Sequence, residues 1–136
     1  MRDDLLLDTN HLAHVVLPVS VVRDRLQRAH LRGVKFGTCI PVLCELEAGI
    51  QQTKDTQARR RRLNYFFMKG MLWQLEQPDS RCFGEIFLEL QRQGRILSHV
   101  DILLAVLARR LRLTILTTDH DFEGLPDIRT ENWLTK

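Results

Sequence analysis

The sequence predicts an α/β domain of three layers, in which helices cover both faces of a mainly parallel sheet of four or five strands. Short apolar runs without alternation, such as Leu5-Leu6-Leu7, are typical of strands that are buried on both faces. These runs alternate with longer segments whose apolar residues recur at helical spacing, which favours a parallel sheet with helical crossovers. The 136 residues are 44% hydrophobic and 27% charged, so we expect a single globular domain over residues 1–136.

Prolines and glycines mark the boundaries of the elements expected in the first half of the chain. Pro18 breaks the helix that begins at Thr9, and Gly33 ends the helix that follows. Pro41 suits the first turn of a third helix, whose apolar residues form one stripe. The elements expected here are strands over 5–8 and 34–40, and helices starting at Thr9, over 21–31, starting at Pro41 and over 56–68.

The second half of the chain continues the alternation. Pro78 lies at the start of a helix with apolar residues at i, i+3, i+4 and i+7, and Gly94 closes it. Ser98 caps a last helix that is apolar almost all round, so we expect this helix to be buried against the sheet. The strands expected in this half cover residues 71–75, 113–117 and, near the C-terminus, 127–130.

Charge, cysteine content and the length of apolar runs limit the class of protein. The net charge of +3 is compatible with a polyanionic partner but does not identify one. No apolar run approaches the ~20 residues of a membrane helix, and the N-terminus leads directly into a strand, so we expect no membrane partner and no signal peptide. Cys39, Cys44 and Cys82 each lie among apolar neighbours, as buried free thiols do. We therefore expect a protein of the reducing cytoplasm.

Four acidic residues lie where separate apolar segments meet polar chain: Asp8, Glu45, Asp101 and Asp119. Asp8 and Asp119 end expected strands, and an open parallel sheet binds its ligands beyond the carboxyl ends of its strands. Asp101 lies in the first turn of its helix and can face the same edge. Converging carboxylates repel one another unless a cation lies between them, and Mg²⁺ or Mn²⁺ is the usual one. The pattern predicts metal-assisted phosphodiester chemistry.

Each of these aspartates also has an ordinary explanation in helix capping. Ser98-x-x-Asp101 is a variant of the capping box, in which the acid only steadies the start of a helix. Asp8 could cap the helix after it, and Asp119 with Asp121 could cap a short helix. Both explanations stay open for each residue taken singly.

Other polar residues lie near the four acids in the sequence, among them a second glutamate. Thr9, Asn10 and Thr117 lie beside the acids and can donate hydrogen bonds that fix the carboxylates. Glu45 and Glu47 flank the apolar stripe of their helix from opposite sides. Helical periodicity does not tell which of the two glutamates faces the cleft.

The acids lie in four short motifs: Leu5-Leu6-Leu7-Asp8-Thr9-Asn10, Cys44-Glu45-Leu46-Glu47-Ala48-Gly49-Ile50, the segment from Gly94 to Ala105, and the segment from Leu116 to Phe122. They resemble the opening strand, the E-L-x-x-G-I helix, the G-x-x-I-x-x-x-D segment and the T-x-D-x-D-F ending of the PIN-domain ribonucleases. More narrowly, the chain resembles the VapC-type toxins of bacterial toxin–antitoxin pairs. One motif alone is a weak pattern, whereas all four in this order and spacing, over nearly the whole chain, are specific.

The resemblance implies a PIN-like nuclease domain that hydrolyses RNA phosphodiester bonds and leaves a 5′-phosphate. It selects Glu45 over Glu47, and it implies that Asp8 and Asp101 are the principal ligands of Mg²⁺ or Mn²⁺. Glu45 would then bind or orient metal-bound water, and Asp119 would complete the cluster or hold a second ion. The bound metal lowers the pKa of water and offsets charge in the transition state. The partners implied are an RNA substrate, a small antitoxin and a second copy of the chain.

The basic segment from Arg59 to Arg62 allows two interpretations. It could track an RNA backbone, with Tyr65, Phe66 and Phe67 stacking on bases. Four consecutive helical residues point in four directions, however, and Leu63, Phe66 and Phe67 share the spacing of a buried stripe. Core packing with a solvated face is therefore the preferred interpretation. In the family that the chain resembles, this region contacts the antitoxin and the second copy.

Two histidines near the first acid have the i, i+3 spacing of metal ligands. No cysteine or third histidine is placed to complete a zinc site with His11 and His14, so we expect both to lie on the surface or to face substrate.

Three other functions stay open at this point. A receiver-like phosphoacceptor domain would need an acidic pair at the end of its first strand, whereas Asp3 and Asp4 precede the first apolar run. A PIN-fold binding module without catalysis would conserve the architecture and lack cleavage. A housekeeping RNA-processing nuclease would have the same chemistry without an antitoxin.

Overall fold

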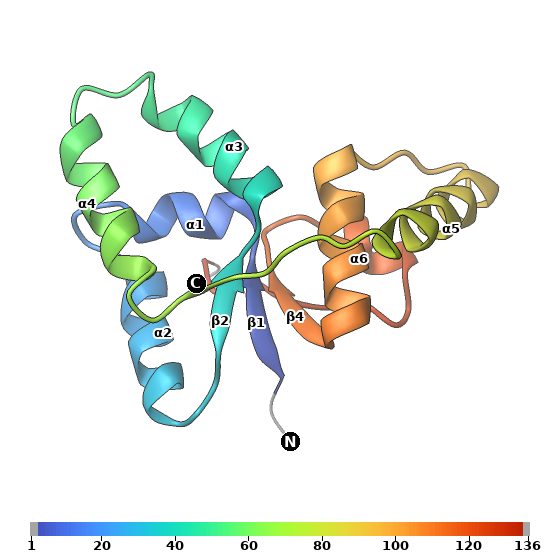
Figure 1. Cartoon of the computed structure of the whole chain (residues 1–136), viewed down its shortest axis with the longest axis horizontal. Coiled ribbons are helices and arrows are strands. Elements are labelled where there is room, and N and C mark those ends of the chain that lie inside the picture. The colour runs from blue at the N-terminus through green and yellow to red at the C-terminus, as the bar shows by residue number, and fades with distance from the viewer. Residues whose placement is uncertain (1–2, 135–136) are drawn as a thin grey trace.

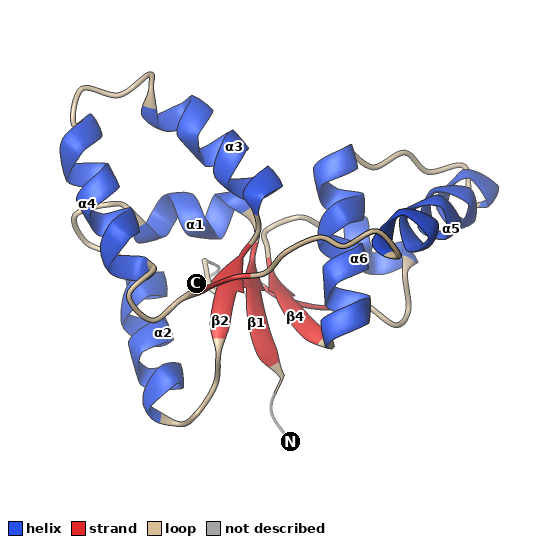
Figure 2. Cartoon of the chain, in the orientation of Figure 1, coloured by secondary structure: helices blue, strands red, loops and turns tan. Residues whose placement is uncertain are grey.

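The computed structural model of the chain describes residues 3–134, in which five strands alternate with six α-helices and a short 3₁₀ helix (Figure 1, Figure 2). The strands are β1 (Asp4–Leu7), β2 (Phe36–Thr38), β3 (Met71–Leu72), β4 (Leu113–Leu116) and β5 (Arg129–Glu131). The helices are α1 (Thr9–Val15), α2 (Val21–Leu31), α3 (Ile40–Ile50), α4 (Thr56–Phe66), α5 (Asp79–Arg92), α6 (His99–Leu111) and the 3₁₀ helix η1 (Asp121–Gly124). The expected strands and helices are all present, with small displacements at their ends.

The sheet is parallel throughout, in the strand order β3-β2-β1-β4-β5. This confirms the parallel sheet that the buried apolar runs predict. The chain builds outward from β1 to β3 and then returns to the other side of β1, so its winding reverses between β1 and β4. Ligands of such sheets bind beyond the carboxyl ends of the strands at this reversal. Receiver-like domains have the order 2-1-3-4-5, so the topology excludes that alternative.

Helices lie on both sides of the sheet, as the three-layer prediction requires. Figure 1 shows α1 to α4 on one side of the strands and α5 with α6 on the other. Helix α6 packs on both β4 and α5. It buries Ile102 and the run from Leu104 to Ala108, which confirms the prediction that it is covered on most of its surface.

The strand expected over 71–75 is shorter in the structure because β3 forms an exposed edge of the sheet. Met71 and Leu72 pair with β2, and each is 41% exposed. Gly37 of β2 permits this close pairing, because a Cβ at that position would collide with the carbonyl oxygen of Met71. A short edge strand presents few unpaired backbone groups to other chains.

The expectations about cysteines and membrane helices have different outcomes. Within residues 3–134, no helix is long and apolar enough to cross a membrane. All three cysteines are free thiols, but only Cys39 is buried, whereas Cys82 is half-buried and Cys44 is exposed. The expectation for Cys44 was wrong because α3 buries the stripe that includes Val42 and Leu46 and leaves Cys44 facing solvent.

Candidate active site

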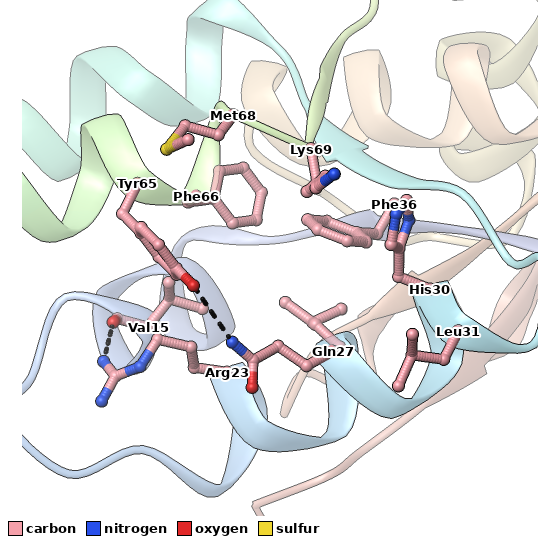
Figure 3. Close-up of a pocket in the computed structure, with 11 residues that line it drawn as sticks. Val15, Arg23, Gln27, His30, Leu31, Phe36, Tyr65, Phe66, Met68 and Lys69 are labelled. Atoms are coloured by element: carbon pink, nitrogen blue, oxygen red, sulfur yellow. Dashed lines mark hydrogen bonds between the residues drawn. The ribbon is translucent and has the colours of Figure 1, made fainter.

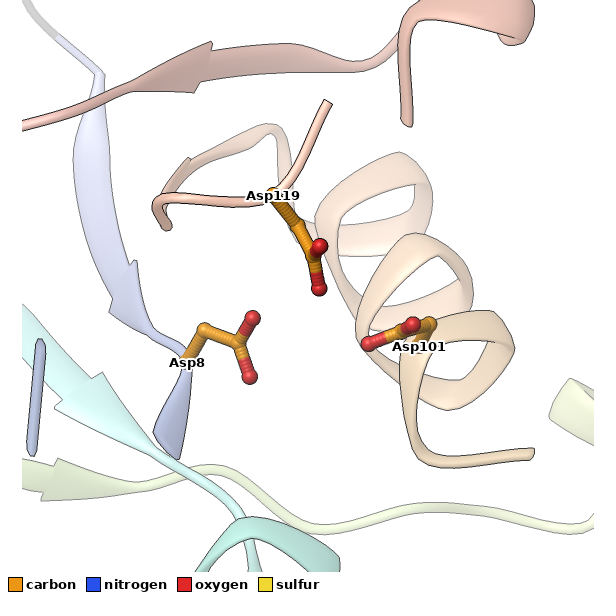
Figure 4. A group of neighbouring side chains, drawn as sticks. All are labelled: Asp8, Asp101 and Asp119. Atoms are coloured by element: carbon orange, nitrogen blue, oxygen red, sulfur yellow. The ribbon is translucent and has the colours of Figure 1, made fainter. Parts of the chain in front are cut away.

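Three aspartates from distant parts of the chain converge where the winding of the sheet reverses. Asp8 follows β1, Asp101 lies in the first turn of α6, and Asp119 lies in the loop after β4. One carboxylate oxygen of each lies within 4.8 Å of one from each of the others. Figure 4 shows the three side chains turned toward a common space. Because Asp8 is buried, Asp101 half-buried and Asp119 exposed, the group runs from the interior to solvent.

Neutral donors hold the Asp8 carboxylate in place. The backbone N–H of Thr9 donates to Asp8 Oδ1 at 2.7 Å, and the Thr117 hydroxyl donates to Oδ2 at 2.7 Å. Asn10 Nδ2 lies 3.4 Å from the same Oδ2 and 3.4 Å from Thr117 Oγ1. The Thr117 hydroxyl oxygen also accepts the backbone N–H of Asp119 at 3.0 Å. One threonine therefore connects two of the three aspartates.

Burial and the repulsion of neighbouring charges make the carboxyl groups of Asp8 and Asp101 harder to ionise. Burial raises the pKa of Asp8, and the charges of Asp119 and Glu45 raise it further, in opposition to the hydrogen bonds from neighbouring threonines. Burial also raises the pKa of Asp101 to about 6, and the charge of Asp8 is the next largest cause. A cation between the carboxylates would remove this repulsion. An all-oxygen group of converging carboxylates therefore fits a hard divalent cation.

Glu45 lies beside the three aspartates without being one of them. It is exposed on α3, and its Oε1 accepts the Thr9 hydroxyl at 2.5 Å. Glu47 instead forms an ion pair with Arg60 of α4. The two glutamates meet different neighbours because they flank the buried stripe of α3 on opposite sides. The structure thus brings Glu45, rather than Glu47, next to the residue that follows Asp8.

Helix capping coexists with the cluster. Asp8 is the N-cap residue of α1, and its Oδ1 accepts the first amide of that helix. At α6 the cap is the Ser98 hydroxyl, which accepts the Asp101 backbone N–H at 3.1 Å. Asp121 begins η1, whereas Asp119 lies before it. Capping therefore explains one oxygen of Asp8 and leaves the grouping of the three carboxylates to be explained.

The expectation that His11 and His14 lie on the surface or face substrate was wrong for His11. His11 is fully buried in α1, and burial lowers its pKa to about 4, with smaller contributions from His14 and Arg25. His14 is half-buried, and its Nδ1 lies 3.1 Å from the Ser20 hydroxyl. The sequence does contain a signal for the burial of His11, because this residue lies one turn before buried Val15 on the same face of α1.

The arginines of α4 are mostly engaged within the protein. Arg59 pairs with Asp55 at 2.7 Å, Arg60 pairs with Glu47, and Arg62 donates to the Val16 carbonyl oxygen at 2.9 Å. Phe66, one turn after Arg62, is buried, and Leu63 and Phe67 pack partly buried against the core, whereas Arg61 is exposed. The interpretation of this segment as core packing with a solvated face is therefore confirmed.

An apolar groove lies between α2 and α4, away from the aspartates. Its volume is about 300 Å³, and Figure 3 shows its lining side chains. Tyr65 and Met68, which are 54% and 72% exposed, lie on the α4 side. On the α2 side, Gln27 Nε2 donates to the Tyr65 hydroxyl at 3.4 Å, and Leu31 is 85% exposed.

Comparisons with known proteins place this geometry in a family context. The sequence model of the PIN domain family matches residues 5–128. The chain is 27% identical to ribonuclease VapC2 of Rickettsia felis over 93 residues, which cover 68% of this chain and 69% of that protein. It is 25% identical to ribonuclease VapC2 of Haemophilus influenzae over 132 residues, which cover 95% of this chain and 97% of that protein.

Solved structures show the same architecture. VapBC2 of Rickettsia felis, bound to a DNA fragment from its promoter, matches with a TM-score of 0.82 at 22% identity, covering 95% of this chain and 98% of the matched chain. DNA-bound VapBC of Salmonella typhimurium matches with a TM-score of 0.81 at 22% identity, covering 97% and 99% of the two chains. At this identity the likeness shows the fold.

Proposed function

The chain belongs to the PIN-domain family, and from that premise we propose that it is a metal-dependent endoribonuclease and the toxin of a toxin–antitoxin pair. The observation that carries the proposal is the convergence of Asp8, Asp101 and Asp119 at the sheet's winding reversal. The match over residues 5–128 supports the further proposal that the 136 residues form a single nuclease domain. The ribonuclease relatives support RNA as the substrate.

The three aspartates would hold the divalent cation, and their all-oxygen donor set favours Mg²⁺ or Mn²⁺ over Zn²⁺. When bound, the cation supplies Lewis acidity, which lowers the pKa of water and offsets charge on the phosphate in the transition state. The Thr117 hydroxyl and the Thr9 backbone N–H fix both oxygens of Asp8. These neutral donors orient the carboxylate without cancelling its charge.

We assign Glu45 to the handling of the attacking water. Its Oε1 accepts the Thr9 hydroxyl, which holds the carboxylate beside Asp8. An exposed carboxylate in that position can accept a proton from water and pass it to solvent. Its charge also contributes to the raised pKa of Asp8, so the two carboxylates interact across the site.

The antitoxin would occupy the apolar groove between α2 and α4. The groove exposes Tyr65, Met68 and Leu31, which is unfavourable in water and favours an apolar segment of a partner. Exposed Met71 and Leu72 continue the apolar surface beyond α4. The VapBC names of the structural neighbours support a partner of the antitoxin kind.

A homodimer is also part of the proposal. Exposed apolar side chains lie on α5 and in the loop after it, where Phe87 is 46%, Leu88 44% and Ile96 96% exposed. A surface of this kind on the other side of the sheet from the groove would leave the groove accessible to an antitoxin.

Cleavage of single-stranded RNA tests the nuclease assignment directly. Wild-type protein should cut RNA with Mg²⁺ or Mn²⁺ and stop when EDTA is added. Cleavage that survives EDTA would contradict the metal assignment, and a folded chain that binds RNA without cutting it would support the binding module.

Growth separates the toxin from a housekeeping nuclease. Expression of the wild-type chain alone should arrest growth, and co-expression with a gene adjacent to it should restore growth and yield a co-purifying complex. Tyr65→Ser with Met68→Ser should weaken that complex while RNA cleavage persists, because the groove lies away from the aspartates. Harmless expression of an active enzyme would favour the housekeeping alternative.

A further inference from the structure

A buried imidazole connects the aspartate cluster to the C-terminal segment. His11 is fully buried, and its Nε2 accepts the backbone N–H of Trp133 at 3.0 Å. A backbone N–H only donates, so Nε2 carries no proton and the neutral ring has its proton on Nδ1. The Nδ1 atom lies 2.7 Å from Asn10 Oδ1 and therefore donates to it.

This donation fixes the orientation of the Asn10 amide. Its Oδ1 also accepts the backbone N–H of Thr118 at 3.2 Å, so two donors identify this atom as the oxygen. The amide nitrogen then faces Asp8 Oδ2 and Thr117 Oγ1. If the amide were reversed, its oxygen would face the Asp8 carboxylate and repel it.

The C-terminal segment that sets the histidine tautomer is itself well anchored. The guanidinium of Arg25 lies over the Trp133 ring at 4.2 Å from its centroid. The Trp133 indole N–H donates to Glu131 at 3.1 Å, and the Glu131 carbonyl oxygen accepts the Thr117 backbone N–H at 3.0 Å. The same segment therefore contacts both Thr117 and His11.

We propose that His11 is a positioning residue for Asp8, which it orients through the Asn10 amide in a tautomer fixed by the Trp133 backbone. The inference rests on the proposed function, since it takes Asp8 as a metal ligand. Any buried histidine needs partners for its two ring nitrogens. What assigns a positioning role is the identity of the Nδ1 partner, because Asn10 is the residue whose amide nitrogen faces Asp8.

Two substitutions separate these roles because each retains one half of the imidazole. In His11→Asn the side-chain nitrogen takes the place of Nδ1 and can still donate to Asn10. In His11→Gln the side-chain oxygen reaches toward the place of Nε2 and can still accept from Trp133, while the donor to Asn10 is lost. Both remove the ring, so the packing lost is common to the pair.

The Mn²⁺ dissociation constant of each purified protein tests the proposal, with thermal unfolding in EDTA as the control for stability. His11→Gln should weaken Mn²⁺ binding by about tenfold, the lower end of the usual effect of groups that orient metal ligands. His11→Asn should bind Mn²⁺ close to wild type even if its melting temperature falls as far. Equal affinity in both variants, or losses that follow stability alone, would overturn the proposal. If wild-type protein does not bind Mn²⁺, the proposed function is wrong and the positioning role falls with it.

The tautomer can be measured on the wild-type chain, so the test does not depend on either variant folding. Nitrogen NMR of ¹⁵N-histidine-labelled protein should show His11 protonated at Nδ1 and unprotonated at Nε2 at neutral pH. Added Mg²⁺ should shift the Nδ1–H resonance more than those of the exposed His30 ring. A proton on Nε2, or resonances indifferent to Mg²⁺, would overturn the proposal.

Discussion

The aspartate cluster and helix α4 both concentrate charge of one sign, but only in α4 does the protein pair part of that charge with groups of opposite charge. Arg59 and Arg60 pair with carboxylates, and Arg62 donates to a helix-terminal carbonyl. The ion pairs formed within residues 3–134 include none of the three clustered aspartates. The donors to the Asp8 carboxylate are a backbone N–H, an amide and a hydroxyl, which orient its charge without cancelling it.

This difference in charge pairing indicates where a ligand of opposite charge would bind. Ion pairs within a protein are explained by their contribution to stability. The raised pKa values of Asp8 and Asp101 instead indicate repulsion that a bound cation can relieve. Runs of like charge in the sequence do not distinguish the two cases. The arginine run is conspicuous in the sequence yet mostly satisfied, and the acids are scattered in sequence yet converge in space.

Removing one carboxylate should have the largest effect on activity. Asp8→Asn or Asp101→Asn should lower RNA cleavage by more than about a hundredfold, because a direct ligand exceeds the usual effect of the groups around it. The fold should persist, since one source of repulsion is gone. Cleavage rates and thermal unfolding of purified variants give the measurement, with Asp24→Asn on α2 as a matched control far from the cluster. A variant that cuts at the wild-type rate would contradict the assignment.

Metal should stabilise the folded protein in proportion to its binding. An ion that binds only the folded state at a hundred times its dissociation constant adds about 2.7 kcal/mol, or roughly 10 °C in melting temperature for a chain of this size. Mg²⁺ or Mn²⁺ should produce this shift and EDTA should reverse it, whereas Zn²⁺ should substitute poorly. Asp101→Asn should show a smaller shift. If millimolar Mn²⁺ leaves the wild-type melting curve unchanged, the cluster does not act as a metal site.

Repulsion among the carboxylates should make the free energy of unfolding of the metal-free protein depend on pH. The pKa of Asp101 is about 6 in the folded protein against an ordinary value of 3.8, so between these pH values the folded protein holds a proton that the unfolded chain has released. The contribution of this group to stability is therefore present below pH 3.8 and is lost as pH rises to about 6. In EDTA, Asp101→Asn should exceed wild type in stability by about 1–3 kcal/mol at pH 7 and match it near pH 4.

Other groups that titrate in the same pH range contribute equally to wild type and Asp101→Asn, so their contributions cancel in the difference between the two proteins. The titration of His11 changes stability in the opposite direction, because its folded-state pKa of about 4 lies below its ordinary value of 6.5. The contribution of His11 to stability is therefore lost as pH falls through that window. Urea unfolding of wild type and Asp101→Asn at several pH values measures the difference. A stability difference between the two proteins that does not change with pH would show that the pKa of Asp101 is not raised in the folded protein.

The sequence predicted the architecture well because local signals agree with it. Continuous apolar runs identify buried parallel strands, and the bounds expected for the second helix, 21–31, are those of α2. The positions of Asp8 and Asp119 at strand ends follow from the same reading. Where the residues alone left Glu45 and Glu47 undecided, the deciding contacts involve Thr9 and Arg60, which helical periodicity does not contain.

His11 shows more clearly which contacts the sequence does not predict. The partner of its Nε2 is the backbone N–H of Trp133, 122 positions along the chain, and its hydrogen bond to Asn10 depends on the tautomer that this contact sets. The i, i+3 spacing to His14 indicated a possible metal ligand, and the one-turn spacing to Val15 indicated burial, but neither spacing identifies the hydrogen-bond partners of the ring. Long-range partners of single polar residues are thus what the sequence did not provide.

The smallest expected effect tests the other half of the comparison, the arginines of α4. Arg62→Gln removes the donor to the Val16 carbonyl oxygen at the end of α1 and should lower stability by about 1 kcal/mol, the usual contribution of one hydrogen bond. Arg61→Gln on the exposed side of the same helix is the matched control and should leave stability unchanged. Cleavage measured at several salt concentrations should respond to neither change if α4 serves core packing and the proposed antitoxin contact rather than RNA. If either substitution weakens RNA binding and reduces its salt dependence by about one unit of slope, that arginine contacts phosphate and α4 belongs to the RNA site.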